Sequence, residues 1–176
     1  MASLAGIFFR RAWFRPWRAA GVRRGAHRLV LVQPLTYVNR TGEVLPALMK
    51  RYGVSSEDLL VVVDQLDLSP GLVRVKPRGG HAGHNGLKSI EEKLKSQNYR
   101  RLWVGVGRPR SGSEQVAHVL GRPSPDDFDR IQREISRAAG VLWSLFLDLE
   151  KTETSIQGAF WENFQNEVNQ RPAPRP

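Results

Sequence analysis

The chain alternates between short apolar runs and longer stretches in which apolar residues recur every three or four positions. Residues 29–33, 59–63 and 102–106 are nearly continuous apolar runs, which is typical of strands buried on both faces of a sheet. Residues 72–76 alternate apolar and charged side chains, as a strand with one exposed face does. The pattern therefore predicts a strand at each of these four places.

Three other stretches have the spacing of an amphipathic helix. Residues 44–52 form a short helix that we expect Gly53 to end. Residues 85–96 form a second helix, and residues 125–149 form a long third one with Ser124 as its N-cap.

Strands that alternate with helices are characteristic of α/β folds. The 176 residues suggest one domain with a single core. We therefore expect an α/β single domain with a mixed, mostly parallel, twisted sheet and helices on both faces. Ligands of such sheets bind beyond the carboxyl ends of the strands. Asp64, the glycine-rich residues 79–89 and Arg108 all follow predicted strands, so the sequence predicts that they lie at one site.

The residues from 79 to 89 read G-G-H-A-G-H-N-G-L-K-S. Glycine allows a backbone to approach a ligand closely or to adopt positive φ. His81, His84 and Asn85 are thereby presented at the start of the second predicted helix, whose free N–H groups suit a phosphate or a carbonyl oxygen. The segment is the strongest candidate for a functional loop.

Several polar side chains have two interpretations. Asp64 is either a turn residue or an acceptor that orients a histidine and raises its basicity. His81 and His84 are bases, phosphate contacts or ordinary loop residues, and the last interpretation is favoured. Asn39 and Asn85 suit peptide or base edges because an amide both donates and accepts, but both also suit turns and caps.

Composition narrows the possible chemistry. The absence of cysteine excludes disulfides and thiolate metal sites. His81 and His84 have no further ligand at a suitable spacing, so we expect no metal. Neither a Walker lysine motif nor a dinucleotide-binding glycine motif occurs, so we expect no cofactor. No apolar run is long enough to span a membrane.

The positive charge is concentrated at the N-terminal end. The net charge is +10, and residues 1–42 contain eight arginines and no acidic residue, while the remaining residues have a net charge of only +2. This distribution suggests a polyanionic partner, most simply nucleic acid, or else a solvated basic face. The first 25 residues have two interpretations: an arginine-rich organellar presequence, or a strand and turn that lead into the next strand.

Several stretches, taken in order, resemble the bacterial-type peptidyl-tRNA hydrolase family. They are residues 33–42 (Q-P-L-T-Y-V-N-R-T-G), 63–68 (V-D-Q-L-D-L), 79–89, 103–109 (W-V-G-V-G-R-P) and 118–121 (H-V-L-G). The order and spacing agree over roughly residues 27–150.

The resemblance implies an esterase that cleaves the bond between a peptide and the ribose of tRNA and so recycles tRNA from aborted translation. A histidine acts as general base in this family, and Asp64 matches the aspartate that stabilises it. Asn39 and Asn85 match asparagines that hold the ester and position water. Tyr37 matches an aromatic residue of the substrate cleft, and His84 is counted with the substrate contacts.

The resemblance also implies the partners. We expect peptidyl-tRNA as the substrate, and a monomeric protein in the cytoplasm or, as the alternative, in a mitochondrion or another organelle. The candidate contacts to tRNA phosphates are Lys76, Arg78, Lys88 and Arg108.

The sequence departs from the family pattern in one respect. Family members begin with a strand and a segment of the form G-N-P-G-x-x-Y-x-x-T-R-H-N-x-G, which holds the catalytic histidine, and by the family spacing this segment would precede Met1. His27 lacks the motif, and residues 8–28 resemble a hairpin of the family instead. We therefore expect a sheet without its first central strand and an inactive chain as written.

Three explanations compete, in this order: a misplaced start, a truncated inactive remnant, or a non-catalytic relative that binds tRNA or another RNA. The expected organisation is an arginine-rich and aromatic-rich segment (1–26), a hydrolase-like domain (27–165) and a tail rich in proline and arginine (166–176).

Overall fold

The computed structural model describes residues 6–11, 14–108, 119–149 and 157–170. The strands are β1 (Arg10–Arg11), β2 (Trp17–Arg24), β3 (His27–Pro34), β4 (Leu60–Gln65), β5 (Val73–Lys76) and β6 (Arg100–Gly105). The α-helices are α1 (Leu45–Tyr52), α2 (Asn85–Leu94), α4 (Pro125–Asp148) and α5 (Gln157–Asn169). Two 3-10 helices, η1 (Val38–Val44) and η2 (Ser56–Asp58), complete the described elements.

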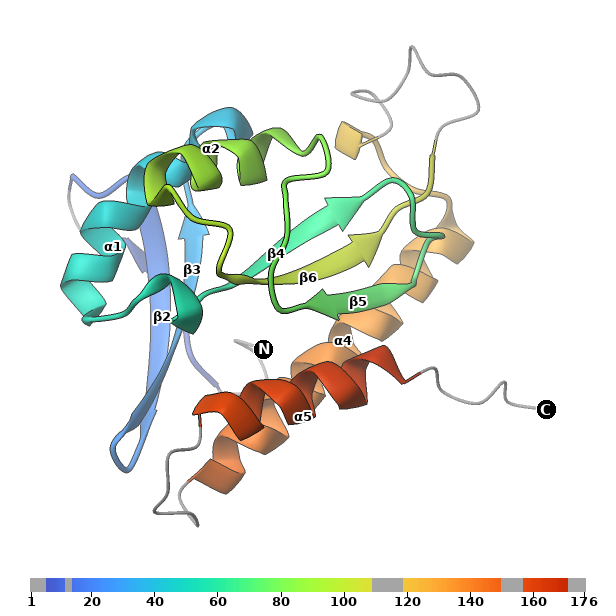
Figure 1. Cartoon of the computed structure of the whole chain (residues 1–176). Coiled ribbons are helices and arrows are strands. Elements are labelled where there is room, and N and C mark those ends of the chain that lie inside the picture. Colours follow the sequence, from blue (N-terminus) through green and yellow to red (C-terminus); the bar gives the residue numbers. More distant parts are fainter. Residues whose placement is uncertain (1–5, 12–13, 109–118, 150–156, 171–176) are drawn as a thin grey trace.

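The described strands form two three-stranded sheets. One is an antiparallel sheet in the order β1-β2-β3, and the other has the order β4-β6-β5. Within the second sheet β4 pairs with β6 in parallel and β5 pairs with β6 antiparallel. Figure 1 shows β2 and β3 beside the second sheet, with β3 on the side of β4.

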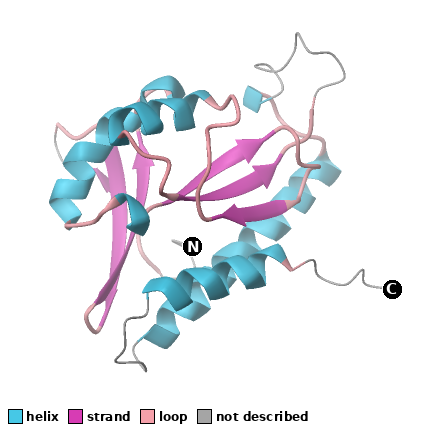
Figure 2. Cartoon of the chain, viewed as in Figure 1, coloured by secondary structure: helices cyan, strands magenta, loops and turns pink. Residues whose placement is uncertain are grey.

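Helices cover both faces of the second sheet, as the sequence predicts. Figures 1 and 2 show α1, α2 and η1 on one face and α4 and α5 on the other. Successive side chains of a strand point to opposite faces, and β6 illustrates the result. Trp103 packs with Leu87 and Ile90 of α2, while Leu102 and Val104 pack with helices α4 and α5. The cluster that contains Trp103 fixes α2 above the sheet and thereby fixes the loop that precedes it.

The expectation of a mostly parallel sheet is wrong. Only the β4–β6 pairing is parallel among the four pairings of described strands. Parallel neighbours need a crossover of about a dozen residues or more. Residues 66–72, which join β4 to β5, are too few for one, whereas the connection from β4 to β6 contains α2.

Most helix predictions are confirmed. Gly53 ends α1 with a left-handed φ of 65°, and the Ser124 side chain caps α4 by accepting from the Asp127 N–H. Helix α2 ends at Leu94, two residues early, because Lys95 adopts φ 51°.

Two elements depart from expectation. The 3-10 helix η1, which has no side-chain cap, is not predicted by the apolar spacing. Helix α5 is not predicted, although Phe160, Phe164 and Val168 have helical spacing, and its residues cross the expected boundary at 166.

The strand-and-turn interpretation of the N-terminal segment agrees with the structure. Strand β2 pairs with β3 from Trp17 to Arg24, across the expected boundary at residue 26. Trp17 is 4% exposed and belongs to the same hydrophobic cluster as α1 and α2. The segment from Trp17 onward is therefore part of the folded domain.

Candidate functional site

Asp64 and His84 form a hydrogen-bonded pair where β4 ends and α2 begins. His84 Nε2 lies 3.1 Å from Asp64 Oδ1. The other ring nitrogen, Nδ1, accepts from the Leu87 N–H at 3.2 Å and so caps α2. Because Nδ1 is the acceptor, the proton of the neutral ring is on Nε2, which donates to Asp64. Of the two interpretations of Asp64, the structure therefore has the acceptor for a histidine.

The pair changes the acidity of the carboxyl group. The hydrogen bond from His84 holds the pKa of Asp64 below its ordinary value, and this effect outweighs the opposing effect of burial. The Asp64 side chain is 32% exposed and that of His84 is 15% exposed. Asp64 is therefore an ionised acceptor at neutral pH, open to solvent on one side.

The glycine-rich loop has a compact, left-handed backbone. Ala82 and Gly83 have φ of 46° and 80°. His84 N–H donates to His81 O at 2.8 Å, and Gly83 N–H donates to His81 Nδ1 at 3.1 Å. At Gly86, a Cβ would lie 2.8 Å from the His84 ring. Glycine at this position therefore lets His84 lie against the first turn of α2.

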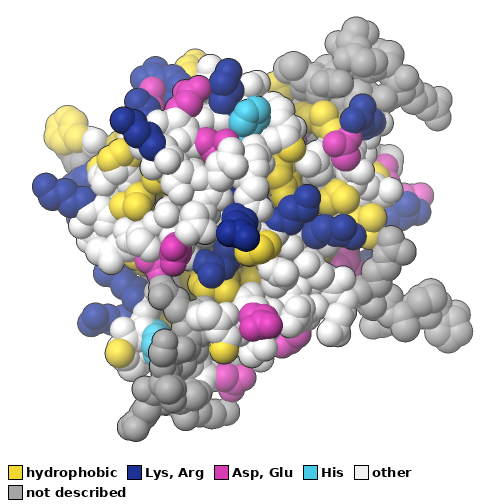
Figure 3. Space-filling view, viewed as in Figure 1, with side chains coloured by type: hydrophobic (Ala, Val, Ile, Leu, Met, Phe, Trp, Pro, Cys, Tyr) yellow, Lys and Arg dark blue, Asp and Glu magenta, His cyan; other side chains and the backbone are white. Residues whose placement is uncertain are grey.

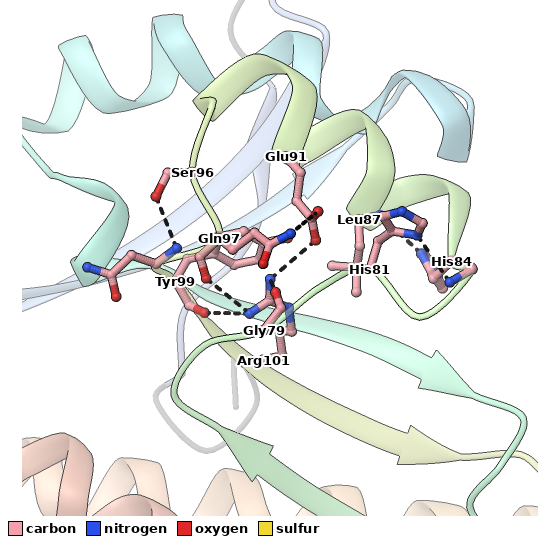
Figure 4. Close-up of polar contacts among 11 residues, drawn as sticks. Gly79, His81, His84, Leu87, Glu91, Ser96, Gln97, Tyr99 and Arg101 are labelled. Atoms are coloured by element: carbon pink, nitrogen blue, oxygen red, sulfur yellow. Dashed lines mark hydrogen bonds and ion pairs between the residues drawn. The ribbon is translucent and has the colours of Figure 1, made fainter.

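A buried arginine fixes the start of this loop (Figure 4). Arg101 of β6 has no exposed surface. Its guanidinium donates to the Gly79 carbonyl and, at 2.9 Å, to the Tyr99 carbonyl, and it lies 3.4 Å from a carboxylate oxygen of Glu91. It also stacks on the Tyr99 ring at 3.9 Å. One side chain thus joins β6, α2 and the loop, so the loop is attached at Gly79 and again at His84.

Helix η1 brings a second motif to the same place. The Gly42 N–H donates to Ser89 Oγ at 3.0 Å, and a Cβ on Gly42 would lie 2.1 Å from the Ser89 carbonyl oxygen. Val38 Cγ2 lies 3.2 Å from where a Cβ on Gly86 would be. The segment at Val38 therefore packs against the first turn of α2, which brings the motif of Tyr37 and Asn39 to the motif of His84 and Asn85.

The side chains with expected substrate roles are accessible. Tyr37 is 79% exposed, and Asn39 and Asn85 are exposed as well. The site thus combines the partly exposed Asp64–His84 pair with exposed amides and an exposed aromatic ring beside it. Such groups are able to hold a polar substrate beside the ionised Asp64.

The four basic candidates differ in their surroundings. Lys76, Arg78 and Lys88 are exposed on β5, the loop and α2. Arg108 is exposed too, but its Nε donates to Asp67 Oδ1 at 2.7 Å, so the aspartate already neutralises it. Figure 3 shows lysine and arginine side chains gathered over β5, in the middle of the face that also presents a histidine.

An apolar cleft of about 1200 Å³ adjoins the pair. Strands β3 and β4 line the cleft along its length. Residues of η1 and α2 line it on one side of the sheet, and residues of α4 and α5 line it on the other. Asp64 and His84 are also among its lining residues. Among the described strands, β3 has a neighbour only in β2, and β4 only in β6. The cleft is therefore bounded by two strand edges that no described strand covers.

Sequence reasoning missed Arg101, Ser89 and Gly42. The signal for Arg101 is its place directly before the apolar run 102–106, because a charge that a strand carries into the core needs partners. Gly42 and Ser89 stand in the matching motifs, but which glycine meets which serine depends on packing. His118, which is among the matching residues, lies outside the described residues.

Within the described ranges, no cluster of three or more His, Asp or Glu side chains is arranged to hold a metal ion. In the same ranges no helix is both long and apolar enough to cross a membrane.

Comparison with known proteins identifies the family. The family model described as "Peptidyl-tRNA hydrolase" matches residues 6–166. The peptidyl-tRNA hydrolase of Halorhodospira halophila is 45% identical over 109 residues, which cover 62% of this chain and 56% of that protein. That of Bordetella parapertussis is 43% identical over 126 residues, which cover 70% of this chain and 59% of that protein.

The fold agrees with this match. The crystal structure of peptidyl-tRNA hydrolase from Acinetobacter baumannii superimposes with a TM-score of 0.81 at 29% identity, covering 96% of this chain and 80% of that one. The fold and the site define an α/β protein whose polar loop lies beyond a strand end. The chain belongs to the peptidyl-tRNA hydrolase family. It spans less than two thirds of the length of the two relatives named above, 56% and 59%.

Proposed function

We propose that this site serves the hydrolysis of the ester bond between peptide and tRNA in peptidyl-tRNA, which recycles tRNA from aborted translation. The observation that carries the proposal is the ionised Asp64 held by His84 beside the exposed Asn85, within a chain that the family model matches over residues 6–166. We propose that it acts as a monomer in the cytoplasm, with an organelle as the alternative; the bacterial relatives support the former.

Each candidate residue has a role in this proposal. Asp64 orients a histidine that takes a proton from the attacking water. Asn39 and Asn85 hold the peptidyl ester and the water, and the exposed ring of Tyr37 packs against the substrate. The exposure of these three side chains supports direct contact. His84 contributes by holding Asp64 and the start of α2 in place.

The phosphates of the tRNA need positive charge. Lys76, Arg78 and Lys88 are the proposed contacts, because they are exposed near the loop and form no ion pair with a described residue. Arg108 makes a weaker contact because Asp67 shares its charge.

The 176-residue chain alone is proposed to be nearly inactive, because neither described histidine of the loop offers a free lone pair. His84 Nδ1 accepts from Leu87, and His81 Nδ1 accepts from Gly83. A general base needs an unoccupied acceptor nitrogen that faces the water. The base is therefore proposed to come with a further strand.

The cleft between β3 and β4 is the proposed place of that strand. Its volume of about 1200 Å³ exceeds the roughly 300–1,000 Å³ of ordinary small-molecule pockets. A strand there would bond to both uncovered edges, which avoids the cost of unpaired backbone groups. A residue near one end of the strand would lie beside Asp64, which borders the cleft.

The test is hydrolysis of N-acetylaminoacyl-tRNA by two proteins: this chain, and this chain joined to a strand and the histidine segment G-N-P-G-x-x-Y-x-x-T-R-H-N-x-G. We expect turnover only from the joined protein, and its loss when the segment's histidine is replaced by glutamine. Turnover by the chain alone would contradict the assignment of the base. A folded joined protein that binds tRNA without turnover would instead favour the alternative, a non-catalytic relative that binds tRNA or another RNA.

A further inference from the structure

The small antiparallel sheet β1-β2-β3 places arginines directly opposite one another. Arg11 pairs in register with Arg18, and Arg23 pairs with Arg28. Side chains that face each other across antiparallel strands lie on the same face with their Cβ atoms about 4.5–5.5 Å apart. Like charges in such positions destabilise a sheet. The sheet contains this unfavourable arrangement twice.

None of these four arginines forms an ion pair with a described carboxylate. Residues 6–42 contain no acidic residue, and the nearest acid along the sequence, Glu43, is bound by Arg40 at 2.9 Å. Arg18 donates to the neutral Gln33 at 2.6 Å, and Arg28 lies over the Tyr52 ring at 5.0 Å. A local arrangement of like charges without an opposite charge is expected at a functional surface, where a partner supplies what the fold lacks.

Aromatic side chains accompany the arginines. Phe8 is 84% exposed, and Arg18 stacks over the ring of Phe9 at 5.7 Å. Guanidinium groups bind phosphates bidentately, and exposed rings stack on bases, which is the combination that proteins use for unpaired nucleic acid. The chemistry that fits this surface is therefore a chain of phosphodiesters with accessible bases.

We propose that the β1-β2-β3 sheet is a second RNA-contacting surface, which holds the sugar–phosphate backbone between and beside its arginine pairs. The choice of RNA as the ligand of this surface rests on the proposed function, whose substrate is peptidyl-tRNA. The turn between β2 and β3 projects away from the end of the molecule where the glycine-rich loop meets α2 (Figure 1). The sheet thus contacts a part of the RNA that is remote from the ester. This contact is separate from the one proposed for Lys76, Arg78 and Lys88.

The test is the affinity for deacylated tRNA, followed by fluorescence anisotropy over a range of salt concentrations. The variant Arg11→Gln/Arg23→Gln removes one arginine from each opposed pair. We expect binding at low salt to weaken about tenfold or more, and the slope of log affinity against log salt to become shallower by roughly 1.4 to 1.8. The variant should unfold at the same or a higher temperature, because it relieves like-charge opposition.

A matched control distinguishes the effect of losing this surface from the effect of a lower net charge. Arg122→Gln/Arg133→Gln removes two exposed arginines, one just before α4 and one on it, and should change binding by less than twofold. Equal effects of the two double variants would overturn the second surface and leave the proposed function standing. Failure of the unaltered chain to bind tRNA would overturn both. Loss of binding to phosphatidylserine vesicles with unchanged tRNA binding would overturn the RNA assignment in favour of a membrane.

Discussion

At the scale of single residues, the site depends on one hydrogen bond between two segments far apart in sequence. Asp64 lies near the end of the partly buried strand β4, and His84 ends a glycine-rich loop, yet Nε2 and Oδ1 lie 3.1 Å apart. The sequence marks both residues as polar groups at strand and helix ends. It leaves the role of each open, because a turn aspartate and an acceptor aspartate have the same sequence pattern.

Asp64→Asn should make stability less dependent on pH. The pKa of Asp64 is lowered in the folded protein, so its contribution is fully present above the ordinary value of 3.8 and is lost as the pH falls below it. We expect a loss of about 1 kcal/mol at pH 7, the difference between a hydrogen bond to a charged group and one to the neutral amide that replaces it. Urea unfolding of both proteins at several pH values measures this. A difference that persists unchanged at pH 2.5–3 would contradict the assignment.

Asn85→Ala should separate substrate contact from folding. Asn85 is exposed at the first residue of α2, so the free energy of unfolding should change by less than about 0.5 kcal/mol. In the protein joined to the histidine segment, the specificity constant for N-acetylaminoacyl-tRNA should fall, because the substrate carbonyl loses its hydrogen-bond donor. Lys93→Ala, on an exposed position of the same helix, is the control. Unchanged kinetics of Asn85→Ala would count against the proposed contact.

At the scale of elements, the contact between η1 and α2 decides where the asparagines lie. Gly42 has to approach Ser89 closely, since a Cβ there would lie 2.1 Å from a backbone oxygen. The two glycine-containing motifs are thus complementary surfaces as well as candidate ligand loops. The sequence predicts α2 well, because its apolar spacing is regular. It does not predict η1, which is shaped by this contact rather than by its own residues.

Gly42→Ala and Gly140→Ala should have opposite effects on stability. The first should destabilise the protein by about 1–3 kcal/mol, since the backbone of η1 has to move away from α2. The second adds a Cβ in α4 with no atom within 4 Å, and should stabilise by about 0.5–1 kcal/mol through helix propensity. Midpoints of urea unfolding at equal slopes compare the two. A neutral Gly42→Ala would show that η1 is not held against α2 as described.

At the scale of the whole molecule, the two three-stranded sheets meet edge to edge, with the apolar cleft between their edge strands β3 and β4. The alternation of backbone groups specifies which amides point into it. Arg100 and Val106 donate to Leu59 and Gln65, so odd-numbered residues of β4 face β6 and even-numbered ones face the cleft. After β3, the Leu35 N–H donates to the Pro16 carbonyl. By the register of β2 and β3, the odd-numbered residues of β3 therefore face β2 and the even-numbered ones face the cleft. The amides directed to the cleft are those of Arg28, Val30, Val32, Leu60, Val62 and Asp64.

Hydrogen exchange should reveal this alternation. In the 176-residue chain, the even-numbered amides of β3 and β4 should exchange faster than their odd-numbered neighbours, Leu29, Leu31, Val61 and Val63, which serve as internal controls. Joining the proposed strand should slow the even-numbered amides and leave the odd-numbered ones nearly unchanged. Protection of both sets alike would indicate general stabilisation and would argue against a strand in the cleft.

The sequence by itself determined the periodic elements, because apolar spacing and turn residues act over a few positions: the four predicted strands, α1, α2 and α4, and the motifs that carry the family resemblance. Tertiary structure alone decided how these parts combine. It paired β5 antiparallel with β6, attached the loop through Arg101, joined Asp64 to His84 and left β3 and β4 facing each other. These outcomes depend on contacts between residues far apart in sequence, where packing and burial choose among partners that local patterns leave equivalent.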